Sequence, residues 1–97
     1  MVIWSDPAKA DLRSIYDYIA HDSRHYAKKG TQDIIEKSES LGGLPRMGRM
    51  VPELGNATIR ELLIYSYRII YQIKDHGIFI LAVIHQRRDL QPDMVEQ

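Results

Sequence analysis

The hydrophobic pattern is clearest in the second half of the chain, where three runs rich in β-branched and aromatic residues follow one another. These runs cover residues 59–65, 67–73 and 78–85, and their composition suits strands with a pleated, half-buried surface. Gly77 lies just before the third run and accepts a positive φ without a Cβ clash, so it predicts a tight hairpin turn. Tyr65-Ser66 separates the first two runs without a glycine, and we expect a loop wider than two residues there.

Side chains alternate across a strand, so the simplest register divides these runs into two faces. The first face is nearly all apolar and carries Leu62, Ile64, Tyr67, Ile69, Tyr71, Ile73, Ile78, Ile80, Ala82 and Ile84. The second face mixes apolar and polar residues and carries Glu61, Leu63, Arg68, Ile70, Gln72, Phe79, Leu81, Val83 and His85. This contrast predicts a core on the first face and a protein partner on the second. Without the partner, Phe79, Leu81 and Val83 are expected to be exposed.

The start of the chain predicts a short strand followed by an amphipathic helix. Residues 1–4 are largely apolar and suggest an edge strand. Ser5-Asp6-Pro7 is typical of a helix start, because a side-chain oxygen caps free N–H groups and Pro stands where a donor is not needed. The stripe that follows ends near His21 and comprises Ala8, Leu12, Ile15 and Ile19.

A second helix is expected to begin after Asp22 or Ser23 and to end at Gly42-Gly43. Its weaker stripe comprises Ala27, Thr31, Ile34, Ser38 and Leu41. The predicted fold is therefore α+β, with an N-terminal strand and an α-helical hairpin packed on one face of an antiparallel sheet. The expected core comprises Leu12, Ile15, Ile19, Ile34, Leu41, Ile69, Ile73, Ile80 and Ala82.

Residues 44–58 contain two prolines and two glycines and predict a loop between the helices and the sheet. We expect this loop to be ordered, because its apolar residues can pack underneath it: Leu44, Met47, Met50, Val51 and Leu54. Arg49 is expected to anchor the loop by bonding backbone carbonyls or Glu53. After the last strand, Asp89 is a candidate cap for a short helical turn that Pro92 limits.

Composition narrows the possible functions. The chain has 97 residues, no Cys and a formal net charge of +0, which predicts one domain over residues 1–97 and excludes thiol chemistry. No membrane-spanning run or signal-peptide pattern is present, so a cytoplasmic location is expected. The balanced charge argues against direct nucleic-acid binding. His21, His25 and His76 lack metal-ligand spacing, and we expect neither a metal nor a cofactor.

Several segments, taken in order, resemble the RelE/ParE superfamily of type II toxin–antitoxin toxins, and the likeness is greater to the ParE branch. They are Trp4-Ser5 with residues 8–15 and 18–20; residues 44–49 with Val51-Pro52-Glu53; Arg60-Glu61-Leu62 with residues 67–71; and Ile80-Leu81, Val83, His85 and Arg87-Arg88-Asp89. The resemblance implies a β-α-α-β-β-β fold, a cognate antitoxin partner, growth inhibition and plasmid stabilisation. ParE-like members act on DNA gyrase, whereas RelE-like members cut mRNA on the ribosome.

The basic residues near the end of the last strand allow two interpretations. RNA cleavage needs a general base, a proton for the leaving oxygen and cations for the phosphate, and as a nuclease the chain has Arg68, His85 and Arg87 as candidate catalytic residues. In the second interpretation Arg68 pairs with Glu61, and the surface binds a protein. The candidate partner-binding residues are then Glu61, Arg68, Phe79, Leu81, Val83, His85, Arg87 and Arg88.

The choice of activity rests largely on the resemblance. RelE-like sites also use several lysines and a C-terminal tyrosine, whereas this chain has no tyrosine after Tyr71 and no lysine after Lys74. We therefore expect a gyrase inhibitor, for which Arg87 and Arg88 supply an exposed contact surface. A ribosome-dependent endoribonuclease and a folded module without toxicity are the alternatives.

Overall fold

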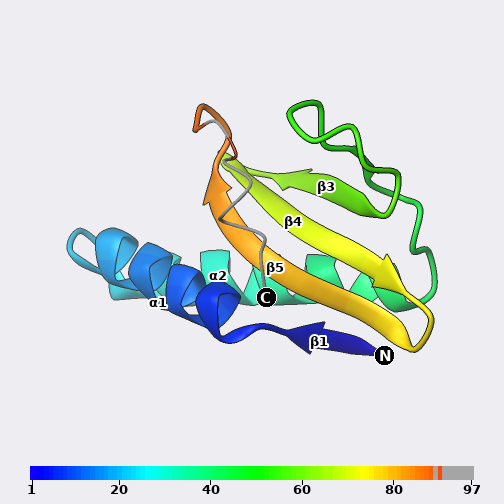
Figure 1. The fold of residues 1–97 in the computed structure, drawn as a ribbon. Helices are drawn as coiled ribbons and strands as arrows, with labels where there is room; N and C mark the ends of the chain where they lie inside the picture. Colours follow the sequence, from blue (N-terminus) through cyan, green and yellow to red (C-terminus); the bar gives the residue numbers. More distant parts are fainter. Residues whose placement is uncertain (89, 91–97) are drawn as a thin grey trace.

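The computed structural model describes residues 1–88 and 90. Its elements are β1 (Val2–Trp4), α1 (Asp6–Ala20), α2 (Arg24–Glu39), a 3-10 turn (Ser40–Gly42), β2 (Arg49–Met50), β3 (Ile59–Ile64), β4 (Tyr67–Lys74) and β5 (Gly77–His85). The five strands form a sheet of order β1-β5-β4-β3-β2. The helical hairpin of α1 and α2 packs against one face of this sheet (Figure 1). The predicted α+β fold is confirmed. The predicted turn at Asp89 lies outside the described residues.

The N-terminal elements follow the predicted signals. Ser5 caps α1, because its Oγ accepts a hydrogen bond from the Ala8 amide at 3.2 Å. Ser23, rather than Asp22, caps α2 through the Tyr26 amide at 3.2 Å. β1 pairs in parallel with β5, so a single edge strand makes an otherwise antiparallel sheet mixed.

The two hairpin turns differ from each other. Gly77 has a φ of 150° and follows the predicted tight turn. The expectation of a wider loop at Tyr65-Ser66 is wrong, because Ile64 pairs directly with Tyr67 and Tyr65 itself takes a φ of 53°. A non-glycine residue with a positive φ is uncommon. Contacts beyond the turn hold it: Gln86 donates from its side chain to the Tyr65 carbonyl at 3.0 Å and from its amide to the Ser66 carbonyl at 2.8 Å.

A β-bulge in β5 changes the predicted faces. Ile70 pairs with Ala82 and Tyr71 pairs with Ile80, so Leu81 has no partner of its own on β4. One extra residue reverses the alternation of every side chain that follows it. Ala82 and Ile84 consequently lie on the face away from the helices, where the simple register placed Val83 and His85.

The helix-side core is confirmed apart from Ala82. It joins stripes of both helices to the dry sheet face through Ala8, Ile15, Ile34, Leu41, Leu62, Ile69, Tyr71, Ile78, Ile80 and Val83, with Leu12, Ile19 and Ile73 packed against them. Burial of these large apolar side chains, each worth about 1.5–3 kcal/mol, is the main force that holds the two layers together.

The other face of the sheet carries a second apolar cluster. It comprises Val51, Ile59, Ile70, Leu81, Ala82, Ile84 and Leu90, with Leu54 and Phe79 partly buried beside them. Leu81 is 1% exposed and Val83, on the helix side, is 3% exposed, so the expectation that both are exposed without a partner is wrong. The loop supplies only part of this cover, because Leu44, Met47 and Met50 are exposed instead of packed beneath it.

Candidate functional site

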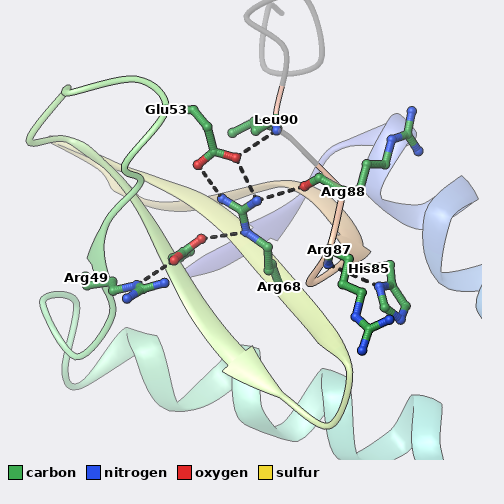
Figure 2. A network of polar contacts seen from close by, with 8 residues as sticks. Arg49, Glu53, Arg68, His85, Arg87, Arg88 and Leu90 are labelled. Carbon is green, nitrogen blue, oxygen red and sulfur yellow. Dashed lines mark hydrogen bonds and ion pairs between the residues drawn. The ribbon is translucent and has the colours of Figure 1, made fainter.

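A network of two arginines and two glutamates lies on the face of the sheet away from the helices. Glu61 comes from β3 and Arg68 from β4, whereas Arg49 comes from β2 and Glu53 from the loop that follows it. The network therefore joins the β3–β4 hairpin to β2 and the loop that follows β2 (Figure 2).

Arg68 is the centre of this network. Its Nε donates to Glu61 Oε1 at 2.6 Å, and its two terminal nitrogens donate to the two oxygens of Glu53 at 2.8 and 2.9 Å. The Arg68 side chain is 7% exposed and that of Glu61 is 1% exposed. A buried ion pair, including a bidentate one such as Arg68–Glu53, stabilises the fold only when each charged group has its hydrogen-bond partners. The predicted Arg68–Glu61 pair is confirmed.

Arg49 fulfils its predicted anchoring role through a different partner. Its Nε donates to Glu61 Oε2 at 2.6 Å, so Glu61 takes the place of the expected partners, which were backbone carbonyls or Glu53. Arg60 also ties the loop to the sheet, because its Nη1 donates to the Gly48 carbonyl at 2.9 Å. The loop is thus fixed to β3 at two adjacent residues. Gly48 is held by the Arg60 side chain, and Arg49 is held by its ion pair with Glu61.

The electrostatics of the network favour the ionised forms. The Arg68 guanidinium lowers the pKa of Glu53 from 4.5 to about 2. In turn, hydrogen bonds to Glu53 and then Glu61 raise the pKa of Arg68, against the opposing effect of burial. A stabilised carboxylate that is ion-paired in this way is a weak base at neutral pH.

An open depression of about 440 Å³ lies beside the network. It is lined by Arg49, Pro52, Glu53, Glu61, Leu63, Arg68 and Gln86. Among the residues that the structure describes, no group of three or more His, Cys, Asp or Glu side chains is placed to hold a metal ion. The depression is therefore lined by paired charges, with Pro52, Leu63 and Gln86 beside them.

Residues 85–88, which are the last residue of β5 and the three residues that follow it, are called the basic segment below. His85 lies on the helix side of the sheet, with its ring centroid 6.1 Å from that of Tyr67, and its Nδ1 accepts a hydrogen bond from the Arg87 amide at 3.1 Å. Figure 2 shows His85 and Arg87 beside each other and apart from the Arg68 network. The predicted catalytic group of Arg68, His85 and Arg87 is thus not assembled, because the bulge turns His85 to the other face.

The backbone of the basic segment is nevertheless bound to the network. Arg68 Nη1 donates to the Arg88 carbonyl at 2.9 Å, and the Leu90 amide donates to Glu53 Oε2 at 2.8 Å. The Arg87 and Arg88 residues themselves are exposed, as the partner-binding hypothesis requires. Their contact with a partner, like that of Glu61, Phe79, Leu81, Val83 and His85, stays a prediction.

Sequence reasoning missed Glu53, Gln86 and Leu90 as members of this site. Glu53 entered it only as a possible partner of Arg49, and Gln86 and Leu90 carried no signal of their own. The one available clue was charge matching: buried Arg68 needs more than one carboxylate, and Glu53 lies in a loop expected to fold back on the sheet.

Comparison with known proteins agrees with this architecture. The family described as ParE toxin of the type II toxin–antitoxin system parDE matches residues 2–90. The chain therefore belongs to this family of toxins and, with it, to the RelE/ParE superfamily. It is the toxin component of a type II toxin–antitoxin system.

Two relatives illustrate the likeness. The chain is 34% identical over 88 residues to Toxin RelE2 of Caulobacter vibrioides, and the match covers 90% of this chain and 96% of that toxin. It also resembles a chain in the structure of the chromosomal ParDE TA system from P. aeruginosa, with a TM-score of 0.74 and 27% identity over 87% of this chain and 92% of that one. No helix among the described residues is long and apolar enough to cross a membrane.

Proposed function

We propose that this toxin inhibits growth by poisoning DNA gyrase, that is, by holding the enzyme with its DNA cut. The observation that carries this choice is that the Arg68 guanidinium is already paired with two carboxylates. A nuclease would use this cation on the scissile phosphate, but here two carboxylates already neutralise it, at 2.6 and 2.8–2.9 Å. An incoming phosphate would have to displace both of them from a nearly buried guanidinium.

The other groups around Arg68 also favour binding over acid–base catalysis. Glu53, with its pKa lowered to about 2, is a poor acceptor for a 2′-hydroxyl proton at neutral pH. The imidazole of His85 lies beside Tyr67 on the opposite side of the sheet, apart from Arg68 and Glu53. An inhibitor needs none of these roles, because a stable contact surface is sufficient.

The second element of the proposal is a cognate antitoxin, which restrains the toxin by binding to it. Family membership supports this partner, as does the similarity to a chain of a ParDE system. The exposed arginines of the basic segment complement an acidic, amphipathic segment that orders on binding. Recovery of a complex after co-expression with the neighbouring open reading frame tests this element, and a monomer recovered without any partner contradicts it.

One assay with two arms tests the activity. In the first arm, purified toxin is incubated with gyrase and supercoiled DNA; in the second, it is incubated with programmed ribosomes and mRNA. Accumulation of cleaved DNA with intact mRNA is the expected result. Codon-aligned mRNA cuts that disappear in Arg68→Ala or His85→Ala would overturn the proposal.

The second candidate is a ribosome-dependent endoribonuclease. The similarity to a toxin named RelE2 favours it, as does the exposed imidazole of His85 beside Arg87. In that case the cuts would depend on His85 and Arg87 but survive Glu53→Gln. The ribosome arm of the same assay separates this result from gyrase poisoning.

A further inference from the structure

The basic segment is bound at both ends by groups from other parts of the fold. At its start, the Gln86 amide donates to the Ser66 carbonyl at 2.8 Å. At its end, the Arg88 carbonyl accepts a hydrogen bond from Arg68 at 2.9 Å. Two residues beyond it, the Leu90 amide donates to Glu53 at 2.8 Å. These hydrogen bonds hold the chain at residues 86, 88 and 90.

Apolar packing secures the same end. The Leu90 side chain is 3% exposed and lies among Val51, Ile59, Ile70 and the bulged part of β5. It therefore packs beneath the loop that carries Glu53, while its amide bonds to the Glu53 carboxylate. The two contacts reinforce each other, because moving either the loop or the segment breaks both.

We propose that Glu53 and Arg68 are positioning residues, which hold the backbone of the basic segment so that Arg87 and Arg88 meet the target in one arrangement. This inference rests on the proposed action on gyrase. A segment that is already ordered loses little conformational entropy on binding. The charges of Glu53 and Arg68 thus act on the target indirectly, through the backbone of residues 88 and 90.

The geometry separates this role from direct contact. Arg68 is nearly buried and fully engaged with Glu53 and Glu61, whereas Arg87 and Arg88 are exposed. The anchoring bonds reach the backbone of Arg88, not its side chain. Replacing Arg87 and Arg88 by alanine therefore leaves the backbone hydrogen bonds in place and removes only the two exposed guanidinium groups.

The test is a double-mutant cycle on the full chain, purified from its complex with antitoxin. Four toxins are compared: wild type, Glu53→Ala, Arg87→Ala with Arg88→Ala, and all three substitutions together. Ile34→Val, in the helix-side core, is the control for a loss of stability away from the segment. Glu53→Gln serves as a milder variant if Glu53→Ala does not fold.

The first readout is the toxin concentration that gives half-maximal cleavage of DNA by gyrase. We expect Glu53→Ala to raise it about tenfold, as the loss of a pre-organised contact does, and Ile34→Val to leave it nearly unchanged. In the background that lacks Arg87 and Arg88, Glu53→Ala should change it by less than about twofold, because coupled residues are not additive. A full tenfold effect in that background overturns the inference, because Glu53 would then act through general stability.

The second readout is amide hydrogen exchange, which does not depend on the target. In Glu53→Ala the Leu90 amide should exchange faster, while the Tyr71 amide in β4 keeps its protection. Unchanged exchange at Leu90 contradicts the anchoring role. If wild-type toxin produces no cleaved DNA, the gyrase proposal fails by itself, and growth inhibition by the same variants then decides whether Glu53 and the arginines are coupled.

Discussion

The Val83 amide donates a hydrogen bond to Asp11 Oδ2 at 3.0 Å, so a helix side chain satisfies a strand donor next to the bulge. Ser5 adds a second link, because its Oγ donates to the Leu81 carbonyl at 3.2 Å. Bulges leave ladder groups without partners, and two polar side chains at the start and second turn of α1 meet that need. The irregular part of β5 is thus held by the layer that packs on it.

Replacing Asp11 tests this relationship. Asp11→Ala leaves the amide of buried Val83 without its acceptor, and we expect a loss of about 1–3 kcal/mol in the free energy of unfolding. Asp11→Asn keeps an acceptor and should stay within about 0.5 kcal/mol of wild type. Urea denaturation measures both. Equal stability of the Ala and Asn variants would show that the hydrogen bond contributes little.

Tyr71 predicts a second stability effect. Its hydroxyl accepts from the Gly48 amide at 2.9 Å and donates to the Pro45 carbonyl at 2.7 Å. Tyr71→Phe removes both bonds and leaves a buried amide unpaired, so a loss of about 1–3 kcal/mol is expected. Tyr26→Phe, at a side chain that is 66% exposed, is the matched control and should change stability by less than about 0.5 kcal/mol.

The conformation of Tyr65 predicts an unusual ranking of two substitutions. Both Tyr65→Gly and Tyr65→Ala lose the hydroxyl that bonds Asp33, so the difference between them reports the backbone alone. At a φ of 53° the glycine variant should be more stable by about 0.5–1 kcal/mol, because it has no Cβ to strain. Thermal unfolding compares them, and a more stable alanine variant would contradict this assignment.

Glu53 predicts a specific dependence of stability on pH. Its pKa in the fold, about 2, is below its ordinary value of 4.5, so the ionised form favours folding. This contribution is complete above about pH 5 and is lost as the pH falls through 4.5 towards 2. The stability advantage of wild type over Glu53→Gln should therefore shrink over that range in urea titrations. An advantage that is constant between pH 6 and 3 would contradict the ion pair.

Much of the architecture follows from local sequence signals. The caps at Ser5 and Ser23, the helical stripes and the three apolar runs each depend on groups close together in the chain, and the structure has all of them. Helix periodicity also predicted which residues meet the sheet, since Ile15 and Ile34 are buried in the helix-side core. These features depend on spacing, which the sequence displays directly.

Other features were decided only by the tertiary structure. The bulge at Leu81 carries no local signal, because its ladder groups are satisfied by Ser5 and Asp11 from the far end of the chain. That single extra residue moved His85 to the helix side and Ala82 to the other face. The tight turn at Tyr65 likewise depends on bonds from Gln86.

The candidate site shows the same division. The sequence by itself predicted that Arg68 and Glu61 share a face of the sheet, because side chains alternate along paired strands. The two-residue turn that sets the register of their strands was seen only in the structure. Only the tertiary structure brought Glu53 from the loop onto Arg68 and set the Leu90 amide against the same carboxylate. The physical reason is that a buried guanidinium takes its partners from whatever segments fold over it, and sequence spacing does not encode which segments those are.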